Sequence, residues 1–213
     1  GLGHTLMRGF KPGRPFWVME QQCGHINWGT YNTGVRPGTV RLWTWHALAS
    51  GAEAVFYFRW RASLYAQEQF HSGLLRHDAS PAPGYADLEA MQAERSLMSE
   101  ISSARHEARV AFLLDYDALW ALCLQPHHRD LDYLRLLFVH YRALQRLGMP
   151  ADIVSADADL NPYKLVIVPT AFLAAEGLAH SLEAFAAAGG TALIGIRSGV
   201  KTTSNRVTDR PLP

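Results

Sequence analysis

The chain has 213 residues, of which 48% are hydrophobic, and its formal net charge at pH 7 is +1. This is enough for one large hydrophobic core or two smaller ones. The small net charge excludes electrostatic attraction to nucleic acid or to an anionic membrane surface, and no apolar stretch of the sequence approaches the roughly 20 residues of a membrane-spanning helix. We therefore predict no nucleic acid and no membrane as partners.

The first half of the sequence predicts alternating helices and strands. Residues 1–9 favour the end of a helix that stops before Pro12, and residues 16–19 form an apolar run without polar alternation. Such a run is typical of a parallel strand that is buried on both faces. A helix is expected over residues 40–50 and a second apolar strand over residues 54–58. The order strand, loop, helix, strand is that of a parallel sheet or barrel.

A long loop separates the second strand from the next predicted helix. The loop runs over residues 61–83, and structured loops of this length in compact domains are usually functional. The spacing of apolar residues predicts a helix over residues 84–101, and the polar segment 102–107 indicates a domain boundary. We therefore divide the chain into residues 1–105 and residues 106–213.

The second half predicts an open, doubly wound α/β sheet. Four strands are expected, at residues 110–114, 153–154, 165–168 and 191–196. The spacing of apolar residues predicts two helices between them, at residues 131–144 and 178–185. Since such sheets usually contain five or more strands, we interpret this domain as incomplete.

The cysteines and the chain ends give two further expectations. Cys23 and Cys123 stand far apart and neither belongs to a CxxC pair, so we expect reduced thiols in a reducing compartment, the cytoplasm. The sequence begins Gly-Leu-Gly and ends Arg-Pro-Leu-Pro, and we interpret it as a piece of a longer protein.

A carboxylate follows the first predicted strand and marks a candidate site. Glu20 comes directly after the apolar run 16–19, where a charged side chain is costly if it is buried without a partner. It is either a charged residue at the solvent end of a strand or a nucleophilic or acid/base carboxylate of the kind that glycosidases use. An ionised carboxylate needs hydrogen-bond donors, which we expect from His25, Asn27 and Arg59.

Two pairs of residues extend this candidate site. Trp28 and Trp60 follow the two predicted strands, where they belong either to the core or to a surface that stacks on the C–H face of a sugar. Glu68 and His71 lie three residues apart in the long loop. This spacing suits a metal pair, two hydrogen bonds to one polyhydroxylated ligand, or a solvated pair on a loop.

Other polar residues give weaker signals of chemistry. The adjacent His127 and His128 follow Pro126 in a predicted loop and would point in opposite directions in an extended stretch, so no metal site is predicted there. Asp115 and Asp117 are expected to cap the turn after the first strand of the second half. An amidotransferase would need a nucleophilic cysteine on a tight strand-to-helix turn, but the strand at 165–168 runs into Pro-Thr-Ala-Phe. The second domain is therefore not predicted to be that enzyme.

Strings from both halves resemble one known family. In the first half these are Phe16-Trp17-Val18-Met19-Glu20-Gln21, Asn27-Trp28, Arg36-Pro37-Gly38, Arg41-Leu42-Trp43, Gly51-Ala52, Phe58-Arg59-Trp60-Arg61 and Glu68-Gln69-Phe70-His71-Ser72-Gly73. In the second half they are Phe112-Leu113-Leu114-Asp115-Tyr116, the helix at 130–150, Tyr163-Lys164-Leu165-Val166 and Arg197-Ser198-Gly199-Val200-Lys201. The chain resembles the glycoside hydrolase family 42 β-galactosidases over nearly its whole length.

The resemblance implies an α/β fold class with two incomplete domains. Residues 1–105 would be the C-terminal βα units of a TIM (β/α)8 barrel, and residues 106–213 a doubly wound, amidotransferase-like α/β domain. That second domain is associated with trimer formation in the family, which implies a homotrimer for the full-length protein. The family's zinc site, where present, lies before this segment, so no metal and no other cofactor is implied here.

The resemblance also implies roles for four residues. Glu20 matches the family's nucleophile, and Trp28, Glu68 and His71 match residues that line its galactose-binding subsite. The parent protein would then be a retaining β-galactosidase, which hydrolyses terminal non-reducing β-D-galactosides by double displacement.

One catalytic group of the family has no match in the sequence. The family's acid/base glutamate belongs to an Asn-Glu pair on an earlier strand, and no such pair occurs here. Retaining hydrolysis needs two carboxyl groups about 5 Å apart, so this chain is expected to be inactive by itself. The alternative is a non-catalytic oligomerisation or carbohydrate-binding module with a degenerate barrel remnant.

Overall fold

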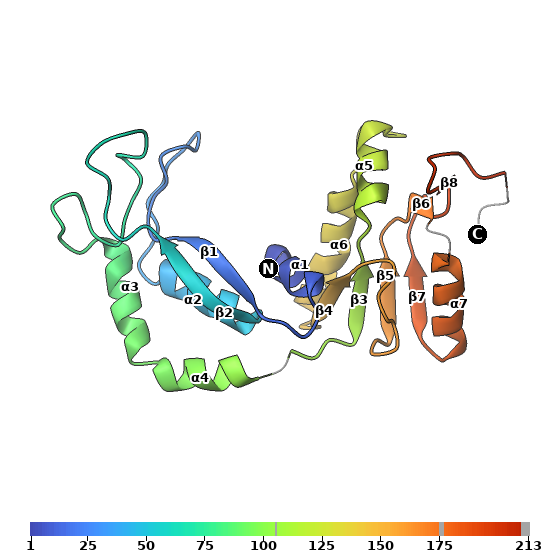
Figure 1. Ribbon diagram of the computed structural model, residues 1–213, viewed down its shortest axis with the longest axis horizontal. Helices are drawn as coiled ribbons and strands as arrows, with labels where there is room; N and C mark the ends of the chain where they lie inside the picture. Colours follow the sequence, from blue (N-terminus) through green and yellow to red (C-terminus); the bar gives the residue numbers. More distant parts are fainter. Residues whose placement is uncertain (105, 175–176, 210–213) are drawn as a thin grey trace. The chain divides into compact units, whose positions relative to one another are not determined.

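The structure is a computed structural model that describes residues 1–104, 106–174 and 177–209 (Figure 1). Contacts between Cα atoms divide the chain into two compact units. The first unit is Gly1 with Gly13–His106, and the second unit is Leu2–Pro12 with Glu107–Pro213. The N-terminal helix thus belongs to the second unit, although the first unit follows it in sequence.

Within its described residues, the first unit contains two strands and three helices. Their bounds are β1 (Phe16–Gln22), α2 (Thr39–Ala49), β2 (Ala52–Phe58), α3 (Pro83–Gln92) and α4 (Arg95–Ser103). β1 and β2 pair in parallel, and α2 connects them (Figure 1). The predicted order of strand, loop, helix and strand is therefore confirmed.

Helix α2 packs against this two-stranded sheet through one face. Val40, Thr44 and Ala47 are buried, and their spacing of three and four residues places them on the same side of the helix. The hydroxyl groups of Thr44 and Tyr57 lie 2.7 Å apart and link α2 to β2 by a hydrogen bond. This contact adds a polar anchor to the apolar packing.

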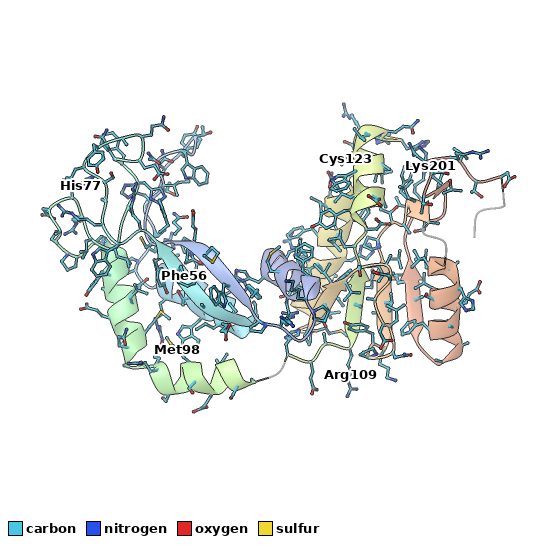
Figure 2. All side chains as sticks on the ribbon, viewed as in Figure 1. Phe56, His77, Met98, Arg109, Cys123 and Lys201 are labelled. Carbon is cyan, nitrogen blue, oxygen red and sulfur yellow. The ribbon has the colours of Figure 1, made fainter. Side chains whose placement is uncertain are left out.

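The predicted burial of the first strand on both faces is wrong. Trp17 and Met19 of β1 are 55% and 62% exposed, and Phe56 of β2 is 45% exposed (Figure 2). Among the described residues β1 pairs only with β2, so a two-stranded sheet with one helix against it leaves these apolar side chains uncovered.

The single helix predicted over residues 84–101 is two helices. The break between α3 and α4 falls at Ala93 and Glu94, where Glu94 leaves the helical conformation. The Glu94 carboxylate accepts hydrogen bonds from the indole N–H of Trp45, at 2.7 Å, and from Nε of Arg41, at 3.0 Å. Apolar periodicity continues through the break, so the sequence pattern alone does not reveal it.

The second unit is built around a parallel sheet with the strand order β4-β3-β5-β7 among its described residues. These strands are β3 (Val110–Leu113), β4 (Ala151–Val154), β5 (Leu165–Val168) and β7 (Thr191–Ile194). The helices are α1 (Leu2–Phe10), α5 (Tyr116–Leu124), α6 (Tyr133–Arg146) and α7 (Leu178–Ala187), and β6 (Leu173–Ala174) pairs with β8 (Lys201–Thr202). The four predicted strands and the mixed α/β class with parallel sheets are confirmed.

Helices cover both faces of this sheet. Alternate residues of β3 point to opposite faces, so Phe112 packs in a cluster with Leu122 of α5 and Leu137 of α6. Leu113 packs in a second cluster, which includes Leu182 of α7. The buried apolar runs predicted for the strands follow from this two-sided packing.

Helix α5 is absent from the predicted elements. Its nine residues are nearly all apolar, so they show no polar face from which a helical period could be recognised. The carboxylate of Asp115 caps the helix by accepting hydrogen bonds from the backbone N–H groups of Asp117 and Ala118, whereas Asp117 lies in the first turn. No helix in the described ranges has the length and apolar content to cross a membrane.

A buried cation lies at the edge of the second unit. Lys201 of β8 is buried, and its Nζ donates hydrogen bonds to the side-chain oxygens of Gln125 and Asn205 (Figure 2). The ammonium also lies 5.3 Å from the ring centroid of Phe172, where a cation interacts with the ring electrons. Lys201 therefore connects the end of α5 to the segment after β8.

Candidate functional site

Glu20 lies on an irregularity of strand β1. Val18 pairs with Val55 and Gln21 pairs with Tyr57, so Met19 and Glu20 together face the single residue Phe56 of β2. Such a β-bulge turns a side chain away from its regular direction, and bulges are common next to active sites. The bulge was not visible in the sequence, because its residues are ordinary strand residues.

The Glu20 carboxylate is exposed rather than buried. Within the described part of the chain it forms no hydrogen bond and no ion pair, so none of the expected donors bonds to it. His25 and Asn27 instead bond to the loop between β2 and α3, and Arg59 bonds to Glu68. An exposed, unpartnered carboxylate remains accessible to an electrophile.

The Arg59 guanidinium holds Glu68. Its Nη2 donates to Oε2 of Glu68 and to the backbone carbonyl of Glu68, both at 3.0 Å. The guanidinium carbon also lies 4.9 Å from the ring centroid of Phe58, so an aromatic face supports it. The side chains of Arg59 and Glu68 are 23% and 47% exposed, which leaves carboxylate surface available to a ligand.

His71 lies one turn after Glu68 and is buried. The backbone N–H of His71 donates to the carbonyl of Glu68 at 3.1 Å, so the two residues share a turn of the loop. Its Nδ1 lies 2.9 Å from the carbonyl of Ser72, which can only accept, so Nδ1 carries the proton and the other ring nitrogen, Nε2, is an acceptor in the neutral ring. The imidazole packs edge-on against the ring of Phe58, with 5.3 Å between the ring centroids.

The two tryptophans of the candidate site are both exposed and do not contact each other. Trp28 is 75% exposed on the loop after β1, and Trp60 is 63% exposed after β2. Trp60 instead packs against the ring of Tyr85 on α3, with 6.5 Å between the ring centroids. Trp28 is therefore the more exposed tryptophan of this pair.

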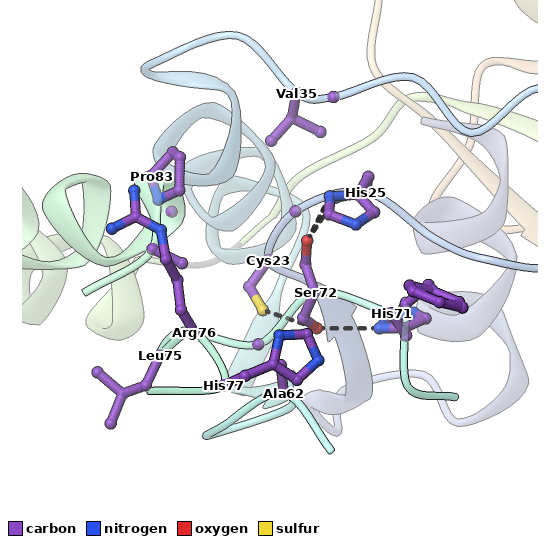
Figure 3. A pocket seen from close by; sticks show the side chains of 16 residues that line it. Cys23, His25, Val35, Ala62, His71, Ser72, Leu75, Arg76, His77 and Pro83 are labelled. Atoms are coloured by element: carbon purple, nitrogen blue, oxygen red, sulfur yellow. Dashed lines mark hydrogen bonds between the residues drawn. The ribbon is translucent and has the colours of Figure 1, made fainter. Parts of the chain in front are cut away.

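A cavity of about 360 Å³ lies beside His71 (Figure 3). It is bounded by the loop after β1, the loop after β2 and the start of α3, and its wall includes Cys23, His25, Ser72 and Pro83. The Cys23 thiol donates to the carbonyl of Phe58 at 3.3 Å, and burial raises the pKa of this thiol above its ordinary value. Cys23 is thus a neutral packing residue of the wall and not a nucleophile.

Metal binding finds no support in the described residues. They contain no group of three or more His, Cys, Asp or Glu side chains placed to hold a metal ion. Hydrogen bonding to one polar ligand and a solvated pair on a loop are the other two interpretations of the spacing of Glu68 and His71.

Comparison with known proteins gives matches over both halves. The family described as β-galactosidase matches residues 1–98, and the β-galactosidase trimerisation domain matches residues 108–213. β-Galactosidase Bga of Halorubrum lacusprofundi is 44% identical over 213 residues, which cover all of this chain and 30% of that protein. A β-galactosidase of Thermus thermophilus is 44% identical over 204 residues, which cover 96% of this chain and 31% of that protein.

The solved structures agree with the sequence matches. The β-galactosidase of Bacillus circulans sp. alkalophilus superposes with a TM-score of 0.95 at 35% identity, over all of this chain and 32% of that structure. The chain thus spans about a third of the length of the relatives it matches. Because the two family matches lie side by side and together span nearly all of it, the chain belongs to the glycoside hydrolase family 42 β-galactosidases.

Proposed function

We propose that this chain is the nucleophile-bearing part of a retaining β-galactosidase that hydrolyses terminal non-reducing β-D-galactosides by double displacement. The observation that carries the proposal is the position of Glu20, an exposed carboxylate on a β-bulge at the end of a strand. The relatives named β-galactosidase, which match 100% and 96% of the chain, support the same activity.

In the proposed reaction the Glu20 carboxylate attacks the anomeric carbon of the galactoside. The bond from that carbon to the leaving-group oxygen breaks while a carboxylic acid protonates the oxygen, and a covalent galactosyl ester forms on Glu20. Water then cleaves this ester with the second carboxyl group acting as base. We assign that acid/base group to the part of the family's enzymes that this chain does not span, so the chain alone is expected to be inactive.

The loop residues are proposed to bind the galactose. The Glu68 carboxylate would accept hydrogen bonds from sugar hydroxyls, and Nε2 of His71 would bond to a further hydroxyl. The exposed indole of Trp28 would stack on the C–H face of the ring. A polyhydroxylated ring with one apolar face matches this combination of groups.

The same proposal extends to the fold and the assembly. Residues 1–105 are assigned to the C-terminal βα units of a TIM barrel, where catalytic groups stand at the strand ends. Residues 106–213 are assigned to an amidotransferase-like domain of a cytoplasmic homotrimer. The match of residues 108–213 to the trimerisation family supports the assembly into a trimer. The exposed face of Trp17, Met19 and Phe56 would be covered by the remaining strands and helices of the barrel.

A chimeric enzyme tests the nucleophile. This chain replaces the segment that it matches in the Thermus thermophilus β-galactosidase, and turnover of a chromogenic β-galactoside is measured. A fluorinated galactoside with a dinitrophenolate leaving group should then label the protein, because it forms the covalent ester faster than water can cleave it. Peptide mass spectrometry should place the label on Glu20, and Glu20→Gln should lower kcat by at least about 1,000-fold.

The matched control is Glu53→Gln in the neighbouring strand. Glu53 is also an exposed carboxylate, but it accepts a hydrogen bond from the indole of Trp17 at 2.8 Å, and its loss should leave kcat unchanged. A non-catalytic module is the second candidate, and the absence of an Asn-Glu pair from the sequence favours it. Turnover that survives Glu20→Gln would contradict the proposed nucleophile.

A further inference from the structure

The proposed sugar-binding residues come from two different loops. Trp28 lies in the loop between β1 and α2, at residues 23–38, whereas Glu68 and His71 lie in the loop between β2 and α3, at residues 59–82. One ligand can contact all three side chains only if these two loops keep a fixed spacing, because a misplacement of about 1 Å can cost a factor of about 100 in rate.

The first connection between the loops joins Ser72 to His25. The backbone N–H of Ser72 donates to the carbonyl of His25, and the N–H of His25 donates to Oγ of Ser72, both at 3.0 Å. The Ser72 hydroxyl also lies 2.7 Å from Nδ1 of His25 (Figure 3). Since the carbonyl of Ser72 holds the ring of His71, this one residue links His25 to a proposed ligand-binding side chain.

The second connection joins Asn27 to Gln67. The side-chain amide of Asn27 donates to the backbone carbonyl of Gln67 at 2.8 Å. Asn27 directly precedes Trp28 and Gln67 directly precedes Glu68. Each connection is therefore one residue away from a side chain of the proposed site.

A glycine allows the two loops to approach this closely. A Cβ atom on Gly24 would lie 2.4 Å from Cβ of Ser72, a distance that two carbon atoms without a bond do not reach. The loops are thus in van der Waals contact beside the His25 connection, and hydrogen bonds and packing set the same spacing.

We propose that Ser72 and Asn27 are positioning residues that hold the loop of Trp28 against the loop of Glu68 and His71. This inference rests on the proposed function, since it concerns the same sugar-binding site. Neither residue is assigned a contact with the sugar. Each acts through the backbone or side chain of its neighbour.

Hydrogen exchange of the complete 213-residue chain tests the connections themselves. Asn27→Asp keeps the shape of the side chain but removes the donor, and Ser72→Ala removes the hydroxyl. Both variants should speed amide exchange in residues 64–73 relative to the unmodified chain. The matched control is Asn32→Asp, because Asn32 uses its oxygen to accept from Gly29 within the same loop and should change nothing there.

Kinetics of the chimeric enzyme test the role in binding. Loss of either connection should raise KM for the galactoside by about fivefold to tenfold, the effect of one net hydrogen bond, and change kcat less. Ser72→Thr keeps a hydroxyl and should restore KM. A KM equal to that of the unmodified chimera in both variants, or unchanged hydrogen exchange, would overturn the positioning role while leaving the proposed function intact.

An inactive unmodified chimera has a different meaning. It would overturn the proposed function, and the exchange measurement on the complete chain would then decide alone whether Ser72 and Asn27 hold the two loops together.

Discussion

Arg8 of α1 forms an ion pair with Asp152 of β4, with 2.9 Å between Nη2 and Oδ1. Nε of Arg8 lies 3.2 Å from the same oxygen, and Nη2 also donates to the backbone carbonyl of Ala151 at 3.0 Å. The two side chains are only 14% and 21% exposed. This pair, with the packing of α1 on β4, explains why the N-terminal helix groups with the second unit.

Replacement of Arg8 by methionine should destabilise the second unit. Methionine keeps the apolar packing of the side chain but leaves the carboxylate of Asp152 partly buried without its cation. We expect the free energy of unfolding to fall by about 2 to 4 kcal/mol, measured by urea denaturation. Arg142→Met, at an exposed position of α6, is the control and should change it by less than about 0.5 kcal/mol.

Tyr133 should make the stability of the second unit decrease at alkaline pH. Its hydroxyl accepts the backbone N–H of Asp115 at 3.0 Å, and burial raises its pKa from about 10 to about 12. A pKa raised on folding gives stability that is fully present below pH 10 and is lost as the pH rises through about 12. A difference of two pKa units between the folded and unfolded states corresponds to about 3 kcal/mol in the free energy of unfolding.

Denaturation at several pH values between 9 and 12 measures this contribution. Burial, together with the charge of Asp152, also raises the pKa of Tyr163 to about 12. The loss of stability of the unmodified chain should therefore include contributions from both tyrosines. Tyr133→Phe should remove its own part of the pH dependence, whereas Tyr65→Phe, at an exposed position, should leave the slope unchanged. An unaltered slope in Tyr133→Phe would contradict the assignment.

The two cysteines should differ strongly in reactivity. Cys23 is 1% exposed and its thiol pKa is raised by burial, while Cys123 is exposed on α5 (Figure 2). Since the thiolate is the reactive species, a disulfide reagent at pH 8 should modify one thiol per native chain and two in denaturant. Cys123→Ser should abolish the native reaction, and a fast reaction that remains would show that Cys23 is accessible.

Much of the fold follows from the sequence, because local patterns determine it. The bounds of β5 coincide with the apolar run Leu165–Val168, which Pro169 ends. The position of α1 does not follow, since Arg8 and Asp152 are 144 residues apart and a residue pattern contains no information about such a pair. The exposure of β1 does not follow from the sequence either, because the residues of the strand do not specify which elements would cover Trp17.

The sequence indicates candidate residues for the site but not their contacts. Glu68 and His71 stand three residues apart in the sequence, and in the structure the backbone N–H of His71 donates to the carbonyl of Glu68. The expected donors of Glu20 bond elsewhere, because the amide of Asn27 donates to the carbonyl of Gln67 and the ring of His25 bonds to the hydroxyl of Ser72. Ser72 gave no signal of its own, since an isolated serine in a loop is common.

The contact between Arg59 and Glu68 leads to a prediction about substrate binding. Two hydrogen bonds from one guanidinium nitrogen fix both the backbone and the carboxylate of Glu68. Lysine keeps the positive charge but does not reproduce the planar guanidinium that lies over Phe58. In the chimeric enzyme Arg59→Lys should therefore raise KM for the galactoside by about tenfold, with a smaller effect on kcat.

A double-mutant cycle separates this effect from general damage to the loop. If Arg59 acts through Glu68, then Arg59→Lys should add little once Glu68→Gln has removed the carboxylate, because the interaction energy is lost only once. Arg76→Lys is the control, since the side chain of Arg76 donates to Oγ of Ser80 within the same loop and is assigned no contact with the sugar, so KM should stay unchanged. Additive losses in the Arg59 and Glu68 variants would mean that the two residues act independently on the sugar.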